Sequence, residues 1–229
     1  MSRAKIGRPR TAGDAGSGDP RRDVLAAAGR LFAAKGVAAT SMADIASEAG
    51  LRPPSLYYWF RGKTAILSEL VAEANRIPLQ VVAEVEAAGG PVPVRLWQVV
   101  CLDVEALCRF DFDINEIHRL VADESEAATT YWADRRRLIE AVEALVAEGI
   151  GAGELRPVDA HLAALTILAN DEGSQNWYRP MGPHQQGHRY EPRQIGSHLA
   201  DLTLSGLLAR PAELDAVRRQ ALAGPFFAA

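Results

Sequence analysis

The apolar residues of the chain recur at helical spacing, and no segment alternates apolar and polar residues as a half-buried strand does. Over residues 20–36 the apolar positions follow the order i, i+1, i+4, i+7 and i+8 from Val24, with Pro20 in the first turn and Gly36 at the end. This pattern predicts an amphipathic helix, and similar patterns through the rest of the chain predict an all-α fold.

Two short helices are expected next. Thr40 or Ser41 stands where an N-cap residue begins a helix that ends at Gly50, and Pro53 opens another that runs to about Trp59. Two short helices that are joined by a glycine-containing turn and packed on a longer first helix form a helix-turn-helix.

The remaining helical patterns cover a larger second part of the chain. The first of them contains Pro78, which predicts a kink, and Asp159 is placed to cap a later one. The expected helices span about 63–88, 93–109, 113–122, 126–148, 160–178 and 193–209, with a last one from about 212.

Four aromatic residues stand side by side at positions 57–60, in a chain with 6 Phe, 4 Trp and 5 Tyr in all. Leu56 and Phe60 share a helix face and are expected to pack into the other two short helices. Tyr57, Tyr58 and Trp59 then point outward, which suits a helix that enters the major groove of DNA. The competing interpretation is that Tyr57 and Trp59 merely flank the small core.

The net charge of −4 hides an asymmetry along the chain. Residues 1–63 hold 11 Lys and Arg and five Asp and Glu, so they carry +6 and the rest of the chain carries −10. A cationic first quarter on an acidic body indicates a phosphate-binding module attached to a part that does not bind phosphate. Residues 1–19 are rich in Gly, Ala, Asp and Arg, and too poor in apolar residues to pack, so a disordered basic arm is expected there.

The hydropathy pattern argues against a membrane-bound or secreted protein. No run approaches the roughly 18 uncharged apolar residues of a membrane span, and no apolar stretch follows the basic N-terminus, so a cytoplasmic protein is expected. An enzyme is not expected either, and no cofactor is implied. The sequence has no GxSxG, HExxH or P-loop motif, and its acidic residues are interpreted as scattered over helix surfaces.

The two cysteines, Cys101 and Cys108, are seven positions apart and are expected to be a buried pair on one helix face. The alternative is a thiol sensor, or half of a metal site that also uses His184, His188 and His198. These histidines lack a fixed ligand spacing, so no metal site is predicted, and a metal- or thiol-responsive regulator is the second functional hypothesis.

Residues 24–71 resemble the DNA-binding region of the TetR (tetracycline repressor) family of bacterial transcription regulators. The resemblance rests on the pattern of the first helix, T-S before I-A, A-G at the turn, and L-Y-x-x-F followed by a lysine. It implies a helix-turn-helix DNA-binding domain over residues 20–66, preceded by the arm at 1–19 and followed by a ligand-binding and dimerisation domain over 67–229.

The DNA contacts of that family come from the start of the second helix, from the third helix and from a lysine that opens the fourth. Carried over by position, the resemblance implies DNA contacts from Thr40, Ser41, Arg52, Pro53, Pro54, Ser55, Tyr57, Tyr58, Trp59 and Lys63. Ala43 and Pro53 stand where many members have polar readers, so readout through apolar contact and DNA shape is expected, with Arg8 and Arg10 entering a narrow minor groove.

The resemblance also implies a homodimer, in which the helices at 160–178 and 193–209 pair with their mates in a four-helix bundle. Residues 153–183 are similar to a subgroup that regulates fatty-acid and steroid breakdown and senses an acyl-coenzyme A. The expected ligand-lining residues are aromatic or polar groups on largely apolar segments: Trp97, Cys101, Phe110, Phe112, His118, Tyr131, Trp132, Asn170 and Trp177. The resulting prediction is a homodimeric repressor that binds a palindromic operator in double-stranded DNA and is released by a small apolar effector, such as an acyl-coenzyme A.

Overall fold

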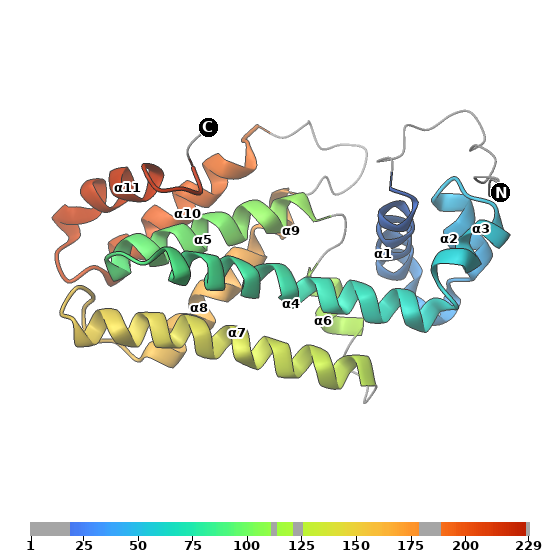
Figure 1. Cartoon of the computed structure of the whole chain (residues 1–229), viewed down its shortest axis with the longest axis horizontal. Coiled ribbons are helices and arrows are strands. Elements are labelled where there is room, and N and C mark those ends of the chain that lie inside the picture. The colour runs from blue at the N-terminus through green and yellow to red at the C-terminus, as the bar shows by residue number, and fades with distance from the viewer. Residues whose placement is uncertain (1–18, 111–113, 121–125, 179–188, 228–229) are drawn as a thin grey trace, which may run out of the picture. The chain divides into compact units, whose positions relative to one another are not determined.

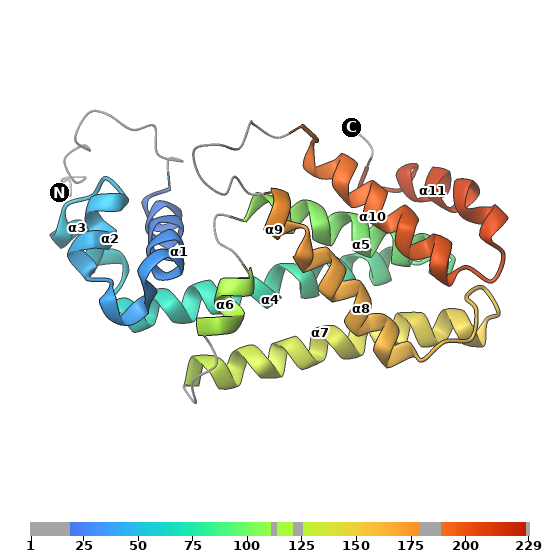
Figure 2. The same cartoon turned by 180° about the vertical axis from the view of Figure 1, so that it is seen from behind.

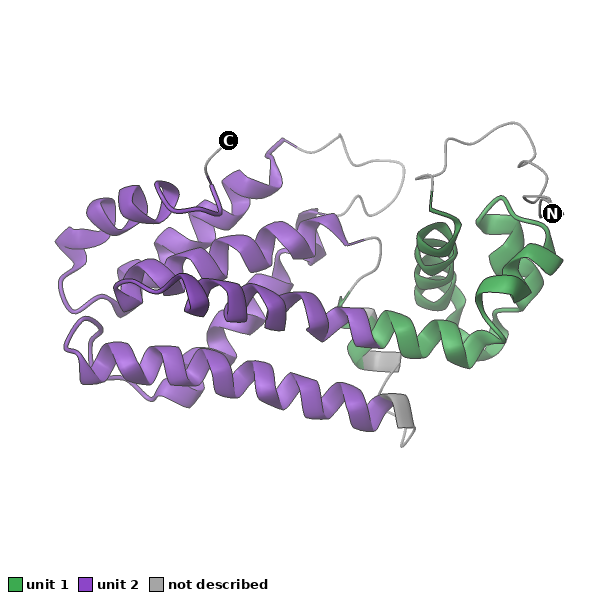
Figure 3. Ribbon diagram, viewed as in Figure 1, with its two compact units in different colours: residues 1–71, 111–122 green, residues 72–110, 123–229 purple. Residues whose placement is uncertain are grey.

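The computed structural model describes residues 19–110, 114–120, 126–178 and 189–227. These residues form helices and no strands, which confirms the predicted all-α fold for this part of the chain (Figures 1 and 2). They make two compact units (Figure 3). Unit 1 consists of residues 19–71 and 114–120, and unit 2 of residues 72–110, 126–178 and 189–227.

Unit 1 holds the short N-terminal helices. Its elements are α1 (Pro20–Ala39), α2 (Met42–Glu48), α3 (Pro53–Trp59), the first part of α4 (Lys63–Ala88) and α6 (Ile114–Leu120). The Asp19 side chain caps α1 by accepting a hydrogen bond from the Arg21 backbone N–H at 2.9 Å. Gly36, with a φ of 80°, interrupts the helical conformation where the sequence predicted the end of the first helix.

The core of unit 1 is small and apolar. Phe32 of α1, Ile45 of α2 and Leu56 of α3 are at most 1% exposed, and Phe60 is 3% exposed. Leu56 and Phe60 therefore fix α3 against its neighbours, as their shared helix face predicted.

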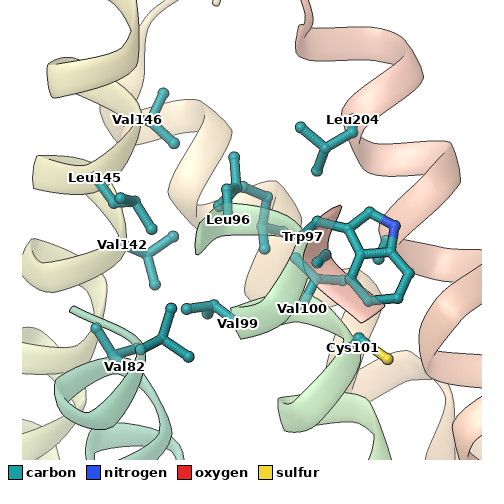
Figure 4. Packing of buried hydrophobic residues seen from close by; sticks show 14 of the residues in the cluster. Val82, Leu96, Trp97, Val99, Val100, Cys101, Val142, Leu145, Val146 and Leu204 are labelled. Carbon is teal, nitrogen blue, oxygen red and sulfur yellow. The ribbon is translucent and has the colours of Figure 1, made fainter. Parts of the chain in front are cut away.

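Unit 2 is built around a central helix. Its elements are the second part of α4, α5 (Val92–Arg109), α7 (Glu126–Gly151), α8 (Ala160–Gly173), α9 (Gln175–Tyr178), α10 (Pro192–Leu207), a 3-10 turn (Pro211–Glu213) and α11 (Leu214–Leu222). Nearly every residue of α5 is buried, because α7, α8, α9, α10 and α11 all contact it. Figure 4 shows Leu96 and Val99 of α5 near Val142 of α7, and Trp97 on the side of Leu204 of α10.

The backbones of α5 and α10 approach closely at Gly196. A Cβ atom at this glycine would lie 2.4 Å from the carbonyl oxygen of Cys101. Only the missing side chain lets the two helices meet at this separation, and Gly196 is therefore a packing requirement of unit 2.

The helix expected over 160–178 is interrupted. Asp159 caps α8 as predicted, accepting from the Leu162 N–H at 2.9 Å, but α8 ends at Gly173 and the short α9 follows. The Ser174 hydroxyl donates to the Asp171 carbonyl at 2.6 Å. A serine that bonds the backbone of its own helix in this way competes with the regular helical ladder, and the interruption falls at this residue.

The other predicted helices lie within a few residues of their observed bounds. The helix predicted to end at 148 continues to Gly151, and the last one begins at Leu214 after the 3-10 turn. Pro78 lies inside α4, and the kink there stays a prediction.

Candidate DNA-binding surface and effector unit

The aromatic row of α3 faces outward. The exposed fractions of Tyr57, Tyr58 and Trp59 are 55%, 81% and 40%, and the rings of Tyr58 and Trp59 meet edge to face with centroids 5.0 Å apart. Tyr58 is thus almost entirely accessible, while Tyr57 and Trp59 are about half covered. A ring pair that stiffens itself in this way offers a preorganised apolar and hydrogen-bonding surface.

The residues that precede this row share the same exposure. Arg52 is the N-cap of α3, Pro53 and Pro54 form its first turn, and Ser55 follows; all four are exposed. Arg61, which the family resemblance does not include, is exposed just after the other end of α3. The structure therefore places these predicted DNA contacts on one short helix, with an arginine at each end.

Several cations of unit 1 are engaged with acids of the same unit. Arg30 pairs with Glu48 at 3.1 Å and Lys35 with Asp44 at 2.8 Å, while Arg21 pairs with Glu69. The hydrogen bond from Lys35 holds the pKa of Asp44 well below its usual range, together with the hydrogen bonds from Ser41. These pairs reduce the positive charge that is left for phosphate.

The start of α2 is organised by a capping box. The Asp44 backbone N–H donates to the Ser41 Oγ at 3.0 Å, and the Ser41 N–H donates to the Asp44 carboxylate at 2.9 Å. Ser41 is the N-cap and is exposed, whereas Thr40 is 1% exposed and donates to the Gly36 carbonyl at 2.8 Å. The Thr40 side chain is therefore directed into the unit, away from the surface that the resemblance assigned to it.

Lys63 opens α4, and its ammonium group caps the end of α1. It donates to the Val37 carbonyl at 2.7 Å and to the Ala38 carbonyl at 3.3 Å. A cation at carbonyls of a helix C-terminus is a stabilising arrangement. No local sequence pattern signals this contact, because it joins residues that are 26 and 25 positions apart.

The described members of the predicted ligand-lining set differ widely in burial. Trp97 and Cys101 are fully buried, Tyr131 is 1% exposed, and Trp132 and Trp177 are 46% and 54% exposed. Asn170 is exposed and Phe110 is half-buried, while His118 lies on α6 of unit 1. Phe112 and the arm residues Arg8 and Arg10 lie outside the described residues.

Trp97 is held by structural contacts. Its indole N–H donates to Asp201 of α10 at 2.8 Å, and its ring meets Phe227 at a centroid distance of 5.7 Å. Asp201 is held in turn by Arg218 of α11 at 2.7 Å. Trp97 thus joins α5 to α10 and to the C-terminal segment.

A pocket of about 420 Å³ lies beside α9 and α10. It is lined by Trp177, Tyr190, Gln194, Ile195, His198 and Leu199. Among the described lining residues, Trp177 is the one member of the predicted ligand-lining set. Tyr190 and Gln194 escaped sequence analysis because they lie just before α10 and in its first turn, where nothing in the local pattern marks a cavity.

Buried ionisable residues form a second feature that sequence analysis missed. Asp103 of α5, and Asp171 and Glu172 of α8, are 4%, 1% and 8% exposed. The interpretation of the acids as scattered over helix surfaces is wrong for these three. Burial raises the pKa of each of them, and their mutual repulsion adds to the shift for Asp103 and Asp171.

The structure offers no support for a metal or thiol sensor. No group of three or more His, Cys, Asp or Glu in the described ranges is arranged to hold a metal ion, and His184 and His188 lie outside them. Cys101 and Cys108 are buried free thiols, and burial raises the pKa of Cys101 to about 11. A thiol of that pKa is almost entirely protonated at neutral pH and reacts poorly.

Within the part of the chain that the structure covers, no helix is long and apolar enough to cross a membrane.

Two family models match the chain. Residues 24–70 match the model for bacterial regulatory proteins of the tetR family, and residues 111–207 match the C-terminal domain of tetracyclin repressor-like proteins. Among curated proteins, the HTH-type transcriptional repressor KstR2 of Mycolicibacterium smegmatis is 26% identical over 208 residues, which cover 82% of this chain and 90% of that protein.

Solved structures show the same fold. AmtR of Mycobacterium smegmatis has a TM-score of 0.67 and 26% identity, covering 94% of this chain and 98% of that one. AibR in complex with isovaleryl coenzyme A and operator DNA has a TM-score of 0.61 and 20% identity, with coverages of 80% and 97%. At 20% identity the likeness to AibR concerns the fold alone.

Proposed function

Because the chain belongs to the TetR family of bacterial transcription regulators, we propose that it reads a palindromic operator with α3 as a homodimer, and that a small apolar effector releases it. It is a ligand-responsive, DNA-binding transcriptional repressor and not an enzyme. The observation that carries the proposal is the exposed row Tyr57, Tyr58 and Trp59 on a helix flanked by Arg52 and Arg61.

The exposure of each side chain suggests its part in binding. Tyr58 and Ser55 are assigned to base edges, and Tyr57, Trp59 and the flanking arginines to phosphates and sugars. Pro53 and Pro54 supply apolar contact but no N–H donors, in keeping with readout of thymine methyl groups and DNA shape. Ser41 remains a phosphate contact in this proposal, whereas Thr40 acts by holding the α1–α2 connection.

The dimer interface is assigned to α8 and α10. Leu162 and Leu165 of α8 and Leu202 of α10 are 60%, 38% and 56% exposed, and the two helices contact each other. Apolar side chains of this size on adjoining helices mark a surface that a second copy covers. A two-fold dimer then presents two copies of α3 to two half-sites, whose centres lie about 34 Å apart on the DNA.

The effector is proposed to be an apolar molecule, with acyl-coenzyme A thioesters as the first class to test. The support is the pocket beside Trp177 and His198, and the isovaleryl coenzyme A that AibR, a protein of the same fold, binds. Residues 63–71 of α4 belong to unit 1 and residues 72–88 to unit 2. A ligand that shifts the second part of α4 therefore also acts on its first turns, where Lys63 lies.

Selection of bound sequences from random DNA by the full-length protein tests the reading of an operator. We expect a dyad-symmetric site, and a selected site without a dyad contradicts the proposal. The same selection with Tyr58→Ala tests the role of α3. If this helix reads the bases, the variant should select a different sequence.

Titration of the operator complex with acyl-coenzyme A compounds tests the release. Linkage requires the ligand and the DNA to weaken each other by the same factor, typically about 5- to 150-fold. We expect release without loss of the dimer mass. Equal ligand affinity with and without operator contradicts a ligand-controlled switch and leaves the DNA-binding role intact.

A further inference from the structure

Three carboxylates and one guanidinium meet in the interior of unit 2. Arg135 of α7 forms an ion pair with Glu172 of α8, with 13% and 10% of the two side chains exposed. Asp103 of α5 interacts electrostatically with both of them, and Asp171 of α8 interacts with Asp103 and Glu172. One cation thus faces three acids, which leaves a surplus of two negative charges when all are ionised.

Three carboxylate oxygens of the acids that Arg135 does not pair lack a hydrogen-bond donor among the described residues. Both carboxylate oxygens of Asp171 and the Oδ1 of Asp103 are buried without a partner among the described residues. Leaving a buried polar group unpaired costs about 1–3 kcal/mol, and more for a charged one. Buried groups without a partner call for an explanation, and perturbed buried carboxylates cluster at functional sites.

A buried polar side chain of a fourth helix is connected to the same cluster through Tyr131. Asn75 of α4 is 1% exposed and donates to the Tyr131 carbonyl at 3.0 Å, and its Oδ1 is buried without a partner. Tyr131 lies one helical turn before Arg135 and interacts electrostatically with Arg135 and Glu172. The unpaired atoms of Asn75, Asp103 and Asp171 are all acceptors, contributed by α4, α5 and α8.

We propose that Asp171 and Asp103 form the subsite that binds a cationic amine group of the effector, which donates N–H hydrogen bonds to these carboxylates. The inference rests on the proposed function, since it assigns a polar group to the otherwise apolar effector. It places that group between α5 and α8, at residues that are not among the described lining of the pocket beside Trp177 and His198. A free amine and an aminoacyl thioester share this chemistry. The three acids are not arranged to hold a metal ion, and their negative charge disfavours an anion.

Two matched sets of compounds distinguish a free amine from an aminoacyl thioester as the ligand. The first shares a 3-phenylpropyl body and carries an amine, a trimethylammonium, a hydroxyl or a carboxylic acid group. The second compares β-alanyl-coenzyme A with propionyl-coenzyme A. Calorimetric titration of the full-length protein without DNA is expected to give at least about tenfold tighter binding for the amine of either set than for its uncharged partner.

The trimethylammonium compound tests whether N–H donation matters, because it keeps the charge and lacks the donors. We expect it to bind more weakly than the primary amine, and the carboxylic acid to show no binding. Equal affinities for amine and alcohol, or no binding of any amine in either set, overturn the proposal.

Asp171→Asn tests the residue itself, because it removes the charge and keeps the shape. It is expected to lower the affinity for the amine at least about tenfold and to leave the affinity for the alcohol unchanged. Glu140→Gln, on the exposed face of α7, is the matched control and should change neither. Asp103→Asn gives a second measurement if Asp171→Asn does not fold, and unchanged amine affinity in a folded variant overturns the assignment.

Failure here is distinct from failure of the proposed function. If propionyl-coenzyme A releases operator DNA while every amine fails to bind, the amine subsite is wrong and ligand-controlled repression stands. If the amine binds through Asp171 without weakening operator binding, the subsite stands and the release mechanism is wrong.

Discussion

Unit 1 carries its functional side chains on the surface over a small apolar core, whereas unit 2 buries ionisable groups beside its large apolar core and exposes apolar side chains on α8 and α10. Tyr58 of unit 1 is 81% exposed, and Asp171 of unit 2 is 1% exposed. Charges at a surface are well solvated and cost little, whereas each buried charge has to be compensated by a partner. The same type of substitution should therefore have a far larger effect on stability at a buried charged residue of unit 2 than at an exposed one.

The largest effect is expected from Arg135→Met, which removes the one cation of the buried cluster. Breaking a buried ion pair by deleting one partner costs about 3–5 kcal/mol, because the remaining charge stays unpaired. Urea unfolding at pH 7.5 measures the loss. Arg137→Met is the control. Arg137 lies two residues after Arg135 on α7 and pairs with Asp134, but its side chain is 70% exposed, so a change of at most about 1 kcal/mol is expected. Equal losses in the two variants would show that burial does not set the cost.

The pH dependence of stability provides a second test of the cost of a buried charge in unit 2. Burial, reinforced by the charge of Glu172, raises the pKa of Asp103 to about 7, above the ordinary value of 3.8. The folded state therefore favours the protonated form, and this contribution to stability is present in full below about pH 4 and lost as the pH rises through about 7.

Asp103→Asn abolishes that titration. The free energy of unfolding of the variant, relative to the natural chain, should rise with pH between 5 and 7, by up to about 1.4 kcal/mol per pH unit. Thermal or urea unfolding over this range measures the slope. A difference that is constant with pH would mean that Asp103 does not titrate there.

Gly196→Ala probes the packing of unit 2 without any charge. The added Cβ would lie 2.4 Å from the Cys101 carbonyl oxygen, so α5 and α10 must separate, at a cost of about 1–3 kcal/mol. Gly206→Ala in the same helix is the control, because a Cβ there meets nothing within 4 Å and alanine favours a helix by about 1 kcal/mol. We expect the melting temperature to fall in Gly196→Ala and to rise in Gly206→Ala. A higher melting temperature for Gly196→Ala would contradict the close approach of α5 and α10.

The two units also differ in how far their chemistry could be predicted from the sequence. In unit 1 the contacts that matter are local: Leu56 and Phe60 fall one turn apart, Ser41 caps the helix that it precedes, and Tyr58 is exposed by its helix phase alone. Periodicity and capping rules see such relations directly. They do not see that Thr40 turns inward or that Lys63 reaches the end of α1, because these contacts depend on tertiary packing.

In unit 2 the site depends on residues that are far apart in the chain. Asp103 and Asp171 are separated by 68 positions, and each alone reads as an ordinary surface acid. The ligand-lining prediction chose aromatic and polar residues by type, and type does not set burial: Trp97 packs in the core, whereas Trp132 is exposed. The all-α fold followed from local spacing, whereas the polar interior needed the three-dimensional structure.

Tyr58→Ala tests the surface chemistry of unit 1. Because Tyr58 is 81% exposed, its loss should leave unfolding unchanged and alter the preferred base at one position of each half-site, by about 1–2 kcal/mol. Competition binding with single-base variants of the selected operator measures this change. Tyr57→Phe removes one hydroxyl and should weaken the binding of all operator variants equally. An equal loss of affinity for all variants with Tyr58→Ala would show that the Tyr58 ring contacts the DNA backbone instead of a base.

The smallest effect is expected at Lys63, whose ammonium group caps α1 in the structure and is proposed to contact a phosphate in the DNA complex. Lys63→Met keeps most of the aliphatic length and removes the charge. Loss of the cap should lower the stability of unit 1 by about 1 kcal/mol, and loss of one phosphate contact should reduce the slope of log affinity against log salt by about 0.9. The two measurements are independent of each other. If the stability falls while the salt dependence of DNA affinity is unchanged, Lys63 serves only as a helix cap. A reduced slope with unchanged stability would show instead that the hydrogen bonds to Val37 and Ala38 contribute nothing, and that the role of Lys63 lies wholly in DNA binding.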